Sequence, residues 1–332
     1  MPKFKFKSAG AAALVAAMVC LRANAAAPVL PPDAIGADSV LVVHADSNVF
    51  TPESLRKAAT AVLGPNAADG NQKLAKFEEK YNAIVKAGGQ SVTMVQESKP
   101  KDAGANEGSD ANKQGITYIQ LKPGADVKAI EKTILDEMSP ADREKAVFEK
   151  KGDFLMMHQK GEAPPAAADA ARTKLFSEAL SSVSDAAVQV AFVPNQLVRD
   201  EAKKGAAEAP KQLQEALPIL TNSKWVTIAV KFGNAPAATA TANAADAESA
   251  QKLADSINGF LGSMKQAAAN PNPQAGPEAM IAMMVAPLAD SLKPKTDGTK
   301  VSMTITGQAV SGIAQMFMGA RQGGPGGPPP GQ

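Results

Sequence analysis

Short apolar runs alternate along this chain with stretches in which apolar residues recur every three or four positions. Short runs of this kind predict β-strands, and the three-to-four spacing predicts amphipathic helices. The segments expected as strands are residues 40–45, 92–95, 116–121, 146–149, 154–158, 188–193, 225–232, 237–242 and 301–305. The pattern therefore predicts an α+β fold.

Helices are expected between these strands. The first should begin where Thr51, Pro52 and Glu53 supply an N-cap, a first-turn proline and a first-turn acid. The Lys-Gly and Asp-Gly pairs at 151–152 and 297–298 predict hairpin turns. The remaining helices are expected over residues 74–84, 127–138, 175–183, 213–220, 253–264 and 310–318.

Both halves of the chain repeat one order of elements: strand, helix, strand, strand, helix, strand, and a trailing helix. We interpret this as a tandem duplication of a ferredoxin-like (split βαβ) unit with antiparallel or mixed sheets. The units are expected at residues 36–160 and 171–320, joined by a linker over 161–170, and the second unit carries an inserted helix near 277–290. The Gly/Pro tail, 321–332, is expected to be disordered. Chance agreement between two α+β halves is the alternative.

Alternation within strands predicts how the sheet is covered. Val301, Met303 and Ile305 are apolar, whereas the intervening Ser302 and Thr304 are polar. Such alternation is typical of a sheet with one buried face and one face turned to solvent or a partner. We therefore expect helices on one face and a second face that is free to bind.

The first 25 residues have the features of a secretory signal. A lysine-rich start precedes an apolar run over residues 9–21, and Ala23 and Ala25 provide the small residues that signal peptidases recognise. The run is shorter than the roughly 20 apolar residues of a membrane span. We predict a removable signal over residues 1–25, with no membrane span after cleavage, and a bacterial protein exported to the periplasm or the medium. An uncleaved anchor is the alternative.

Loss of this segment changes the charge and the cysteine content. The chain has 332 residues, with 35 Lys plus Arg, 33 Asp plus Glu and one Cys. The signal contains Lys3, Lys5, Lys7, Arg22 and Cys20, so the formal charge changes from +2 to about −2. A slightly acidic chain argues against nucleic acid as a partner. A chain without cysteine has no disulfide, thiolate metal site or cysteine nucleophile.

Few residues suggest chemistry. The two histidines, His44 and His158, lie near strand ends that a ferredoxin-like sheet would place at opposite edges, so a shared metal site is not expected. His44, Asp46 and Ser47 have the residue types of a hydrolase triad, but a turn after the strand also accounts for them. We predict no catalytic, cofactor or metal site, and His44, Asp46, Ser47 and His158 remain as weak candidates.

The Ser-x-x-Lys spacing of penicillin-recognising enzymes occurs twice, at residues 54–57 and 249–252. Both copies fall in the first turns of expected helices, where serine is common as a capping residue. The other motifs of those enzymes are missing from the sequence. Capping is therefore the preferred interpretation.

An opening strand follows soon after the signal, and each of the two α+β units has a turn, at residues 151–152 or 297–298, that leads into a strand. This pattern resembles that of secreted bacterial proteins that carry only domains of unknown function. The resemblance covers about residues 36–320 and rests on pattern and composition. It implies no activity and assigns no functional residues.

The function expected from these observations is that of an exported, non-catalytic binding or structural protein of the cell envelope, with a protein or envelope partner. Two alternatives remain open. One is a periplasmic hydrolase or transferase that uses carboxylate and lysine chemistry, and the other is a small-ligand carrier with a site between the two units. A joined sheet would favour a protein partner, and a deep cleft would favour a small molecule.

Overall fold

The structure is a computed structural model that describes part of the chain. The described residues are 28–31, 33–47, 49–63, 71–98, 115–161, 167–206, 219, 221–233, 235–269, 282, 285–307 and 309. The expected signal (1–25), the tail (321–332) and the expected helix at 310–318 lie outside them. The expected helix at 213–220 lies outside them except for residue 219, and of the expected helix at 277–290 only residues 282 and 285–290 are described.

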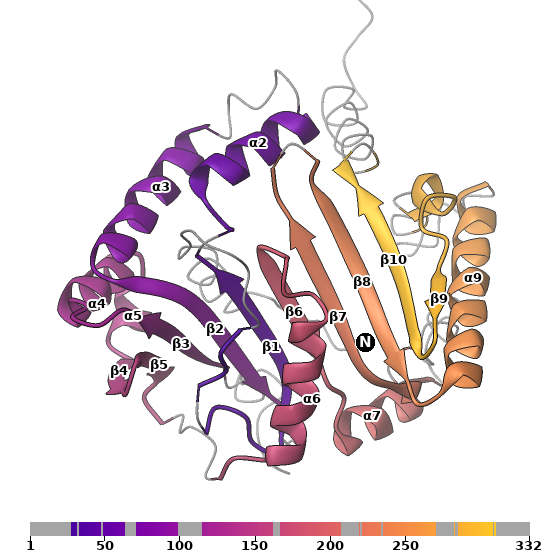
Figure 1. The fold of residues 1–332 in the computed structure, drawn as a ribbon, viewed down its shortest axis with the longest axis horizontal. Coiled ribbons are helices and arrows are strands. Elements are labelled where there is room, and N and C mark those ends of the chain that lie inside the picture. The colour runs from indigo at the N-terminus through magenta and orange to yellow at the C-terminus, as the bar shows by residue number, and fades with distance from the viewer. Residues whose placement is uncertain are drawn as a thin grey trace, which may run out of the picture.

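Ten strands form a single antiparallel sheet (Figure 1). They are β1 (Ser39–Asp46), β2 (Gly89–Glu97), β3 (Gly115–Leu121), β4 (Ala146–Lys151), β5 (Phe154–Gln159), β6 (Val188–Phe192), β7 (Ser223–Lys231), β8 (Ala237–Ala244), β9 (Lys295–Asp297) and β10 (Lys300–Thr306). Their order across the sheet is β4-β5-β3-β2-β1-β6-β7-β8-β10-β9. The predicted α+β class is confirmed, and of the antiparallel and mixed arrangements that were expected, the sheet is antiparallel.

Helices lie in the connections between strands. They are α2 (Pro52–Leu63), α3 (Asn71–Lys86), α4 (Val127–Leu135), α5 (Pro140–Arg143), α6 (Ala170–Ser181), α7 (Gln196–Ala206) and α9 (Ala247–Ala269), with a 3-10 turn η3 (Ala286–Leu288). The sequence pattern missed α7 because that helix is mostly polar. Its start is nevertheless marked by Asn195, whose Oδ1 accepts a hydrogen bond from Val198 N at 2.9 Å.

The strand order differs from that of a ferredoxin-like unit. In the first half, β1 pairs with β2, β2 with β3, and β3 with β5, so β1 and β5 are not neighbours. The physical reason lies between β1 and β2, where the chain forms two helices, α2 and α3. A single helix would return the chain parallel to the first strand, whereas two helices bring β2 back antiparallel to β1.

The order is symmetric about its centre. The first half contributes β1 to β5 and the second half contributes β6 to β10, and the corresponding strands lie at equal distances from the middle. There β1 pairs antiparallel with β6, from Leu41 opposite Phe192 to Ala45 opposite Val188. We call this pairing the seam.

The two faces of the sheet can be followed across the strands by their register. Residues that pair directly share a face, because side chains alternate along each strand. The α6 face includes Val42 and Trp225, which belong to one buried cluster with Phe176 of α6. The opposite face, here called the α9 face, includes Val301, which packs with Leu253 of α9. Helices therefore lie on both faces, so the expectation that one face would be free of helices is wrong.

Helix α6 lies over the middle of the sheet (Figure 1) and contacts both halves. Its Phe176, Ala179 and Leu180 are fully buried. The same cluster holds Val42 of β1 and Trp225 of β7, so one helix covers strands from both sides of the seam. Trp225 is 2% exposed and is therefore a packing residue.

Two further clusters cover the ends of the α9 face. In the first half, α3 and α4 contribute Ile84, Ile130 and Ile134. In the second half, α9 contributes Leu253 and Ile257. At one end of the seam, Tyr81 of α3 packs in a cluster with Ala45, and Val188 packs against that cluster. Elsewhere the helices of this face lie mainly toward the two ends of the sheet (Figure 1).

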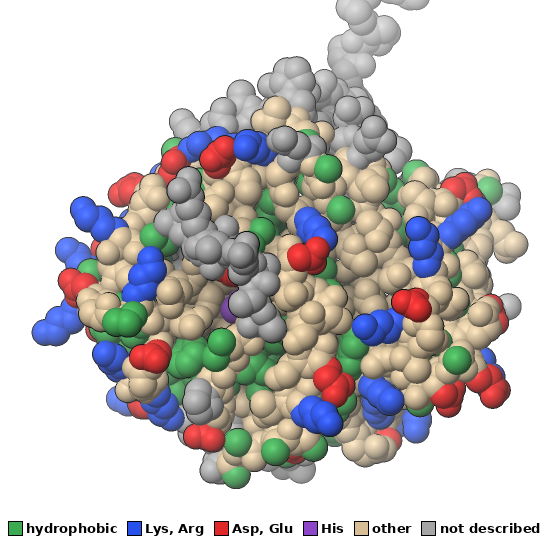
Figure 2. All heavy atoms as spheres, viewed as in Figure 1, with side chains coloured by type: hydrophobic (Ala, Val, Ile, Leu, Met, Phe, Trp, Pro, Cys, Tyr) green, Lys and Arg blue, Asp and Glu red, His purple; other side chains and the backbone are tan. Residues whose placement is uncertain are grey.

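Charged side chains of both signs are interspersed on the surface that Figure 2 shows. Several form exposed ion pairs, such as Lys231 with Asp185 and Arg56 with Glu78. Exposed pairs of this kind contribute little to stability. Over the described part of this surface, positive and negative side chains therefore lie next to one another.

Gly88 lies between α3 and β2, in close contact with Ala125. Its φ is +102°, and a Cβ atom there would lie 2.7 Å from Ala125 Cβ and 2.9 Å from Ala125 Cα. We expect Gly88→Ala to lower the free energy of unfolding by about 2 kcal/mol or more, because it adds a clash to backbone strain. Gly124→Ala is the matched control, since Gly124 also has a positive φ, +78°, but open space around it. Urea unfolding followed by Trp225 fluorescence should show the larger loss for Gly88→Ala, and equal losses would contradict the packing at this junction.

Candidate functional site

His44 and Asp46 lie on the α6 face of β1, two residues apart. The His44 ring is 4% exposed, and its Nδ1 lies 2.9 Å from Thr93 Oγ1 on the adjacent strand β2. Burial lowers the pKa of His44 to about 4. At neutral pH the ring is therefore uncharged and held by a neutral hydroxyl group, which suits a structural histidine.

Asp46 and Ser47 form the turn that ends β1. Ser47 N donates to Gln90 O at 3.1 Å, and Asp46 O accepts from Phe50 N at 3.1 Å. Both side chains are buried. These backbone bonds direct the chain away from the sheet toward α2, as a strand-end turn requires.

His158 lies on β5, on the same face of the sheet as His44. Its Nδ1 is 3.0 Å from Gln159 O, and its Nε2 is 3.5 Å from Glu149 Oε1 on the edge strand β4. Two strands, β2 and β3, separate β1 from β5, and His158 lies two residues along β5 from the row of His44, so the histidine backbones are roughly 16 Å apart. The separation comes from the intervening strands and not from the ferredoxin-like geometry that the sequence suggested.

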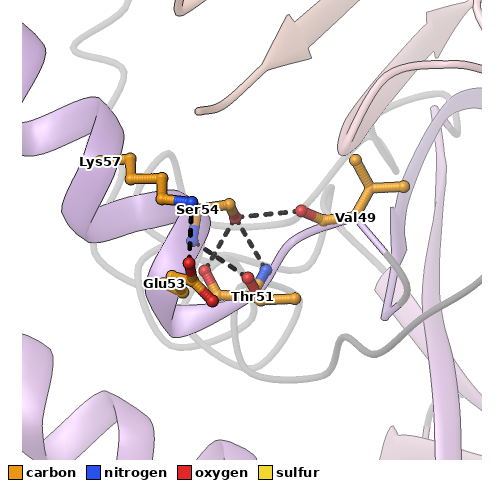
Figure 3. A network of polar contacts seen from close by, with 5 residues as sticks. All are labelled: Val49, Thr51, Glu53, Ser54 and Lys57. Carbon is orange, nitrogen blue, oxygen red and sulfur yellow. Dashed lines mark hydrogen bonds and ion pairs between the residues drawn. The ribbon is translucent and has the colours of Figure 1, made fainter. Parts of the chain in front are cut away.

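The first Ser-x-x-Lys copy is a helix cap (Figure 3). Ser54 N donates to Thr51 Oγ1 at 3.0 Å, and Thr51 N donates to Ser54 Oγ at 2.9 Å, a reciprocal pair of the capping-box type. Lys57 Nζ lies 2.7 Å from Glu53 Oε1. Ser54 is therefore paired with Thr51, and Lys57 with Glu53, and the two are not paired with each other.

The second Ser-x-x-Lys copy repeats this arrangement at the start of α9. Ser249 N donates to Asp246 Oδ1 at 2.7 Å, and Lys252 pairs with Glu248. The backbone hydrogen bond from Ser249 lowers the pKa of Asp246, and the hydrogen bond to Glu248 raises the pKa of Lys252. Capping and surface ion pairing account for both shifts.

Tyr118 is a further buried group in the same row of the α6 face as His44. Burial, together with the negative charges of Glu97 and Asp33, raises the pKa of Tyr118 to about 12. The phenol therefore stays neutral at any physiological pH. Among the described residues, no three His, Asp or Glu side chains come together in a possible metal site.

The α9 face carries a surface feature that no short sequence motif indicates. Six residues in register form one transverse line on the α9 face, which we call the central row. Its members, in spatial order from β2 to β10, are Met94, Val43, Val190, Ile228, Ala240 and Met303. The row spans five strand spacings, roughly 24 Å.

The central row is apolar but not buried. Ile228 is 44% exposed, and the other five members are half-buried. The residues that flank the row on β6 and β7 are also apolar, with Phe192 and Val226 on one side and Val188 and Val230 on the other. A connected, uncharged, partly exposed surface therefore crosses the seam between the helices at the two ends of the sheet.

The sequence contained part of the signal for this surface. Alternation in the last strand correctly placed Met303 and Ile305 on the apolar side, where they pack beside the α9 cluster. The row as a unit was missed because it depends on the register of six strands. None of the helices in the described part of the chain combines the length and hydropathy needed to cross a membrane.

The capping interpretation of residues 54–57 makes a simple prediction. Ser54→Ala should lower the free energy of unfolding by about 1 kcal/mol, because it removes one half of the reciprocal cap. Lys57→Gln is the comparison, and it should change that free energy by no more than about 0.5 kcal/mol, since its ion pair with Glu53 is exposed. Urea unfolding of both variants measures the difference. A larger effect for Lys57→Gln would contradict the interpretation.

No protein-family model matches this chain, and no curated protein matches it. Among solved structures, crystal form I of TP0453 is similar over 88% of this chain and 99% of that chain, with 7% sequence identity and a TM-score of 0.33. A likeness at this level carries no argument about fold or function.

Proposed function

We propose that this chain is an exported, non-catalytic binding protein of the cell envelope and that the central row is its binding surface. The observation that carries the proposal is the partial exposure of six aligned apolar side chains, of which Ile228 is the most exposed. Connected apolar patches on a protein surface are typical of interaction sites, because leaving them in water costs free energy. The export part rests on the signal pattern of residues 1–25.

A protein partner is favoured over a small ligand held between the two halves. The halves are joined edge to edge by the five residue pairs of the seam, and α6 covers the seam on its other side. Strand pairing therefore occupies the place where a site between the units would lie. A partner that presents an apolar strand or helix face would match the uncharged central row.

The proposal predicts that Ile228 controls binding to apolar probes. Wild-type protein should bind Nile red, a neutral apolar dye, and Ile228→Lys should weaken that binding by about thirtyfold, since burial of an isoleucine side chain is worth about 2 kcal/mol. Fluorescence titration of the dye measures the affinity.

Thr306→Lys is the matched control for this experiment. Thr306 is exposed on β10 and faces the α6 side of the sheet, so the variant adds the same charge away from the central row. It should bind the dye as the wild type does. Equal affinities for all three proteins, or no binding by any of them, would refute the central row as the binding surface.

We also propose that the two halves arose by tandem duplication. The halves match in strand order, and the hairpin glycines Gly152 and Gly298 share a φ of +57°. In both halves, a helix between the third and fourth strands lies on the α9 face, α4 in the first and α9 in the second. The strand order of each half is not that of a ferredoxin-like unit, so the duplicated unit would be a different antiparallel one.

The duplication can be tested by superposition in an experimentally determined structure. A single rotation about the seam should carry β1, β2, β3, β4 and β5 onto β6, β7, β8, β9 and β10, with α4 falling on α9. Strands that superpose only one at a time, or helices that fall on opposite faces, would contradict a common origin.

A further inference from the structure

The chain turns onto the α9 face of the sheet directly after β10. The backbone is helical at Gly307 and Ala309. A Cβ atom at Gly307 would lie 2.7 Å from Pro236 Cγ, so the close approach of Pro236 requires glycine at this turn. Ala309 packs against the α9 cluster, as does Met303 of the central row. The last described residue of the chain therefore lies on the same face as the row.

The residues that follow lie outside the described part of the chain, and their sequence has the apolar spacing of a helix that continues from this turn. With about 3.6 residues per turn, one face would hold Ala309, Val310, Ile313, Met316 and Phe317. The other face would hold Ser311, Gln315 and Met318. The side of the chain that packs on the α9 face at Ala309 would therefore continue as an apolar stripe.

This segment and the central row are both uncharged. None of the residues from 307 to 320 is Asp, Glu, Lys or Arg. The six members of the row, and the residues that flank it on β6 and β7, are apolar. Contact between the two would bury apolar side chains of both without removing a charge from water.

The segment is long enough to reach the most exposed residue of the row. Strands lie about 4.8 Å apart, so Ile228 on β7 is roughly 10 Å across the sheet from β10. A helix rises about 1.5 Å per residue, so Phe317 would lie roughly 12 Å along the helix from Ala309. A helix that starts at β10 and crosses the row therefore brings Phe317 to the neighbourhood of Ile228.

A helix also suits the layer in which the row lies. On this face α9 packs at one end of the sheet, and α3 and α4 pack at the other. A further helix, about 10 Å across, would complete the same layer. The flat sheet of a second copy of the chain would instead meet these helices before it touched the row.

We propose that residues 310–318 form an amphipathic helix that packs on the central row and occupies the binding surface until a partner displaces it. The inference rests on the proposed function in that the row is a binding surface, and it adds an occupant from the chain itself. An apolar partner then competes with the segment. The apparent affinity of that partner is lowered in proportion to the fraction of molecules whose row is free.

Charged substitutions on the two faces of the segment test this occupancy in the full chain. Ile313→Asp together with Phe317→Asp places two carboxylates on the apolar face. If the segment covers the row in about nine molecules of ten, this variant should bind Nile red about tenfold more tightly than the wild type does. Ser311→Asp together with Gln315→Asp is the matched control, because it adds the same charges at the same spacing to the opposite face. The control should bind the dye as the wild type does.

The outcomes of this titration separate the inference from the proposed function. Wild-type affinity in the Ile313/Phe317 variant, or equal tightening in the control, would overturn the inference, and the row would remain a binding surface if Ile228→Lys alone weakens dye binding. Adding Ile228→Lys to the Ile313/Phe317 variant should abolish the gain. A gain that survives this third substitution would place the dye elsewhere and overturn the inference together with the proposed surface.

A disulfide would locate the segment directly. In a chain carrying Cys20→Ser, Ile228→Cys with Phe317→Cys should form an intramolecular disulfide on mild oxidation. Ile228→Cys with Gln315→Cys should form one more slowly, because residue 315 would lie on the far side of the helix. Non-reducing electrophoresis and mass spectrometry measure both rates. Equal rates would overturn the inference, and so would a crosslink between two molecules, which would make a second copy of the chain the occupant.

Discussion

The antiparallel pairing of β1 with β6 is the contact on which the rest of the sheet depends. Without it, each half would end in an unpaired edge strand whose backbone donors and acceptors face water or another chain. The five residue pairs of the seam, from Leu41 opposite Phe192 to Ala45 opposite Val188, satisfy both edges at once. They also bring Val43 and Val190 into line, which makes one central row out of two shorter ones.

Arg172 reinforces one end of the seam. Its Nε donates to Ser39 O at 3.0 Å, and its Nη2 donates to Val193 O at 2.7 Å, so one guanidinium group ties the start of β1 to the residue after β6. Burial lowers the pKa of Arg172, but arginine remains charged in proteins, and its hydrogen bonds to carbonyl oxygens are correspondingly strong. Helix α6 carries Arg172 and Phe176, so a single helix holds both halves. The opposite side of the sheet, near the seam, is where apolar residues stay partly exposed.

Local patterns predicted the elements well and their pairing poorly. Thr51 and Pro52 marked the start of α2, and the turn at 151–152 correctly predicted the β4–β5 hairpin. In the structure, His44 and His158 lie on the same face as Val42 and Met156, as the alternation of side chains along each strand requires. The seam could not be predicted, because a buried apolar strand has the same sequence pattern whether its neighbour lies in its own half or more than a hundred residues away. The central row depends on that pairing, and so it could not be found from the sequence either.

The most direct test of the seam is a disulfide across it. Val43→Cys with Val190→Cys, in a chain carrying Cys20→Ser, should form an intramolecular disulfide on mild oxidation, because directly opposed strand residues lie within the Cα separation of about 4.4–6.8 Å that a disulfide needs. Val43→Cys with Ala240→Cys places the thiols three strands apart and should remain reduced. Mass spectrometry of the oxidised proteins reads out both. A crosslink in the first pair alone is the predicted result. No crosslink there, or an equal crosslink in the second pair, would contradict the seam and the account built on it.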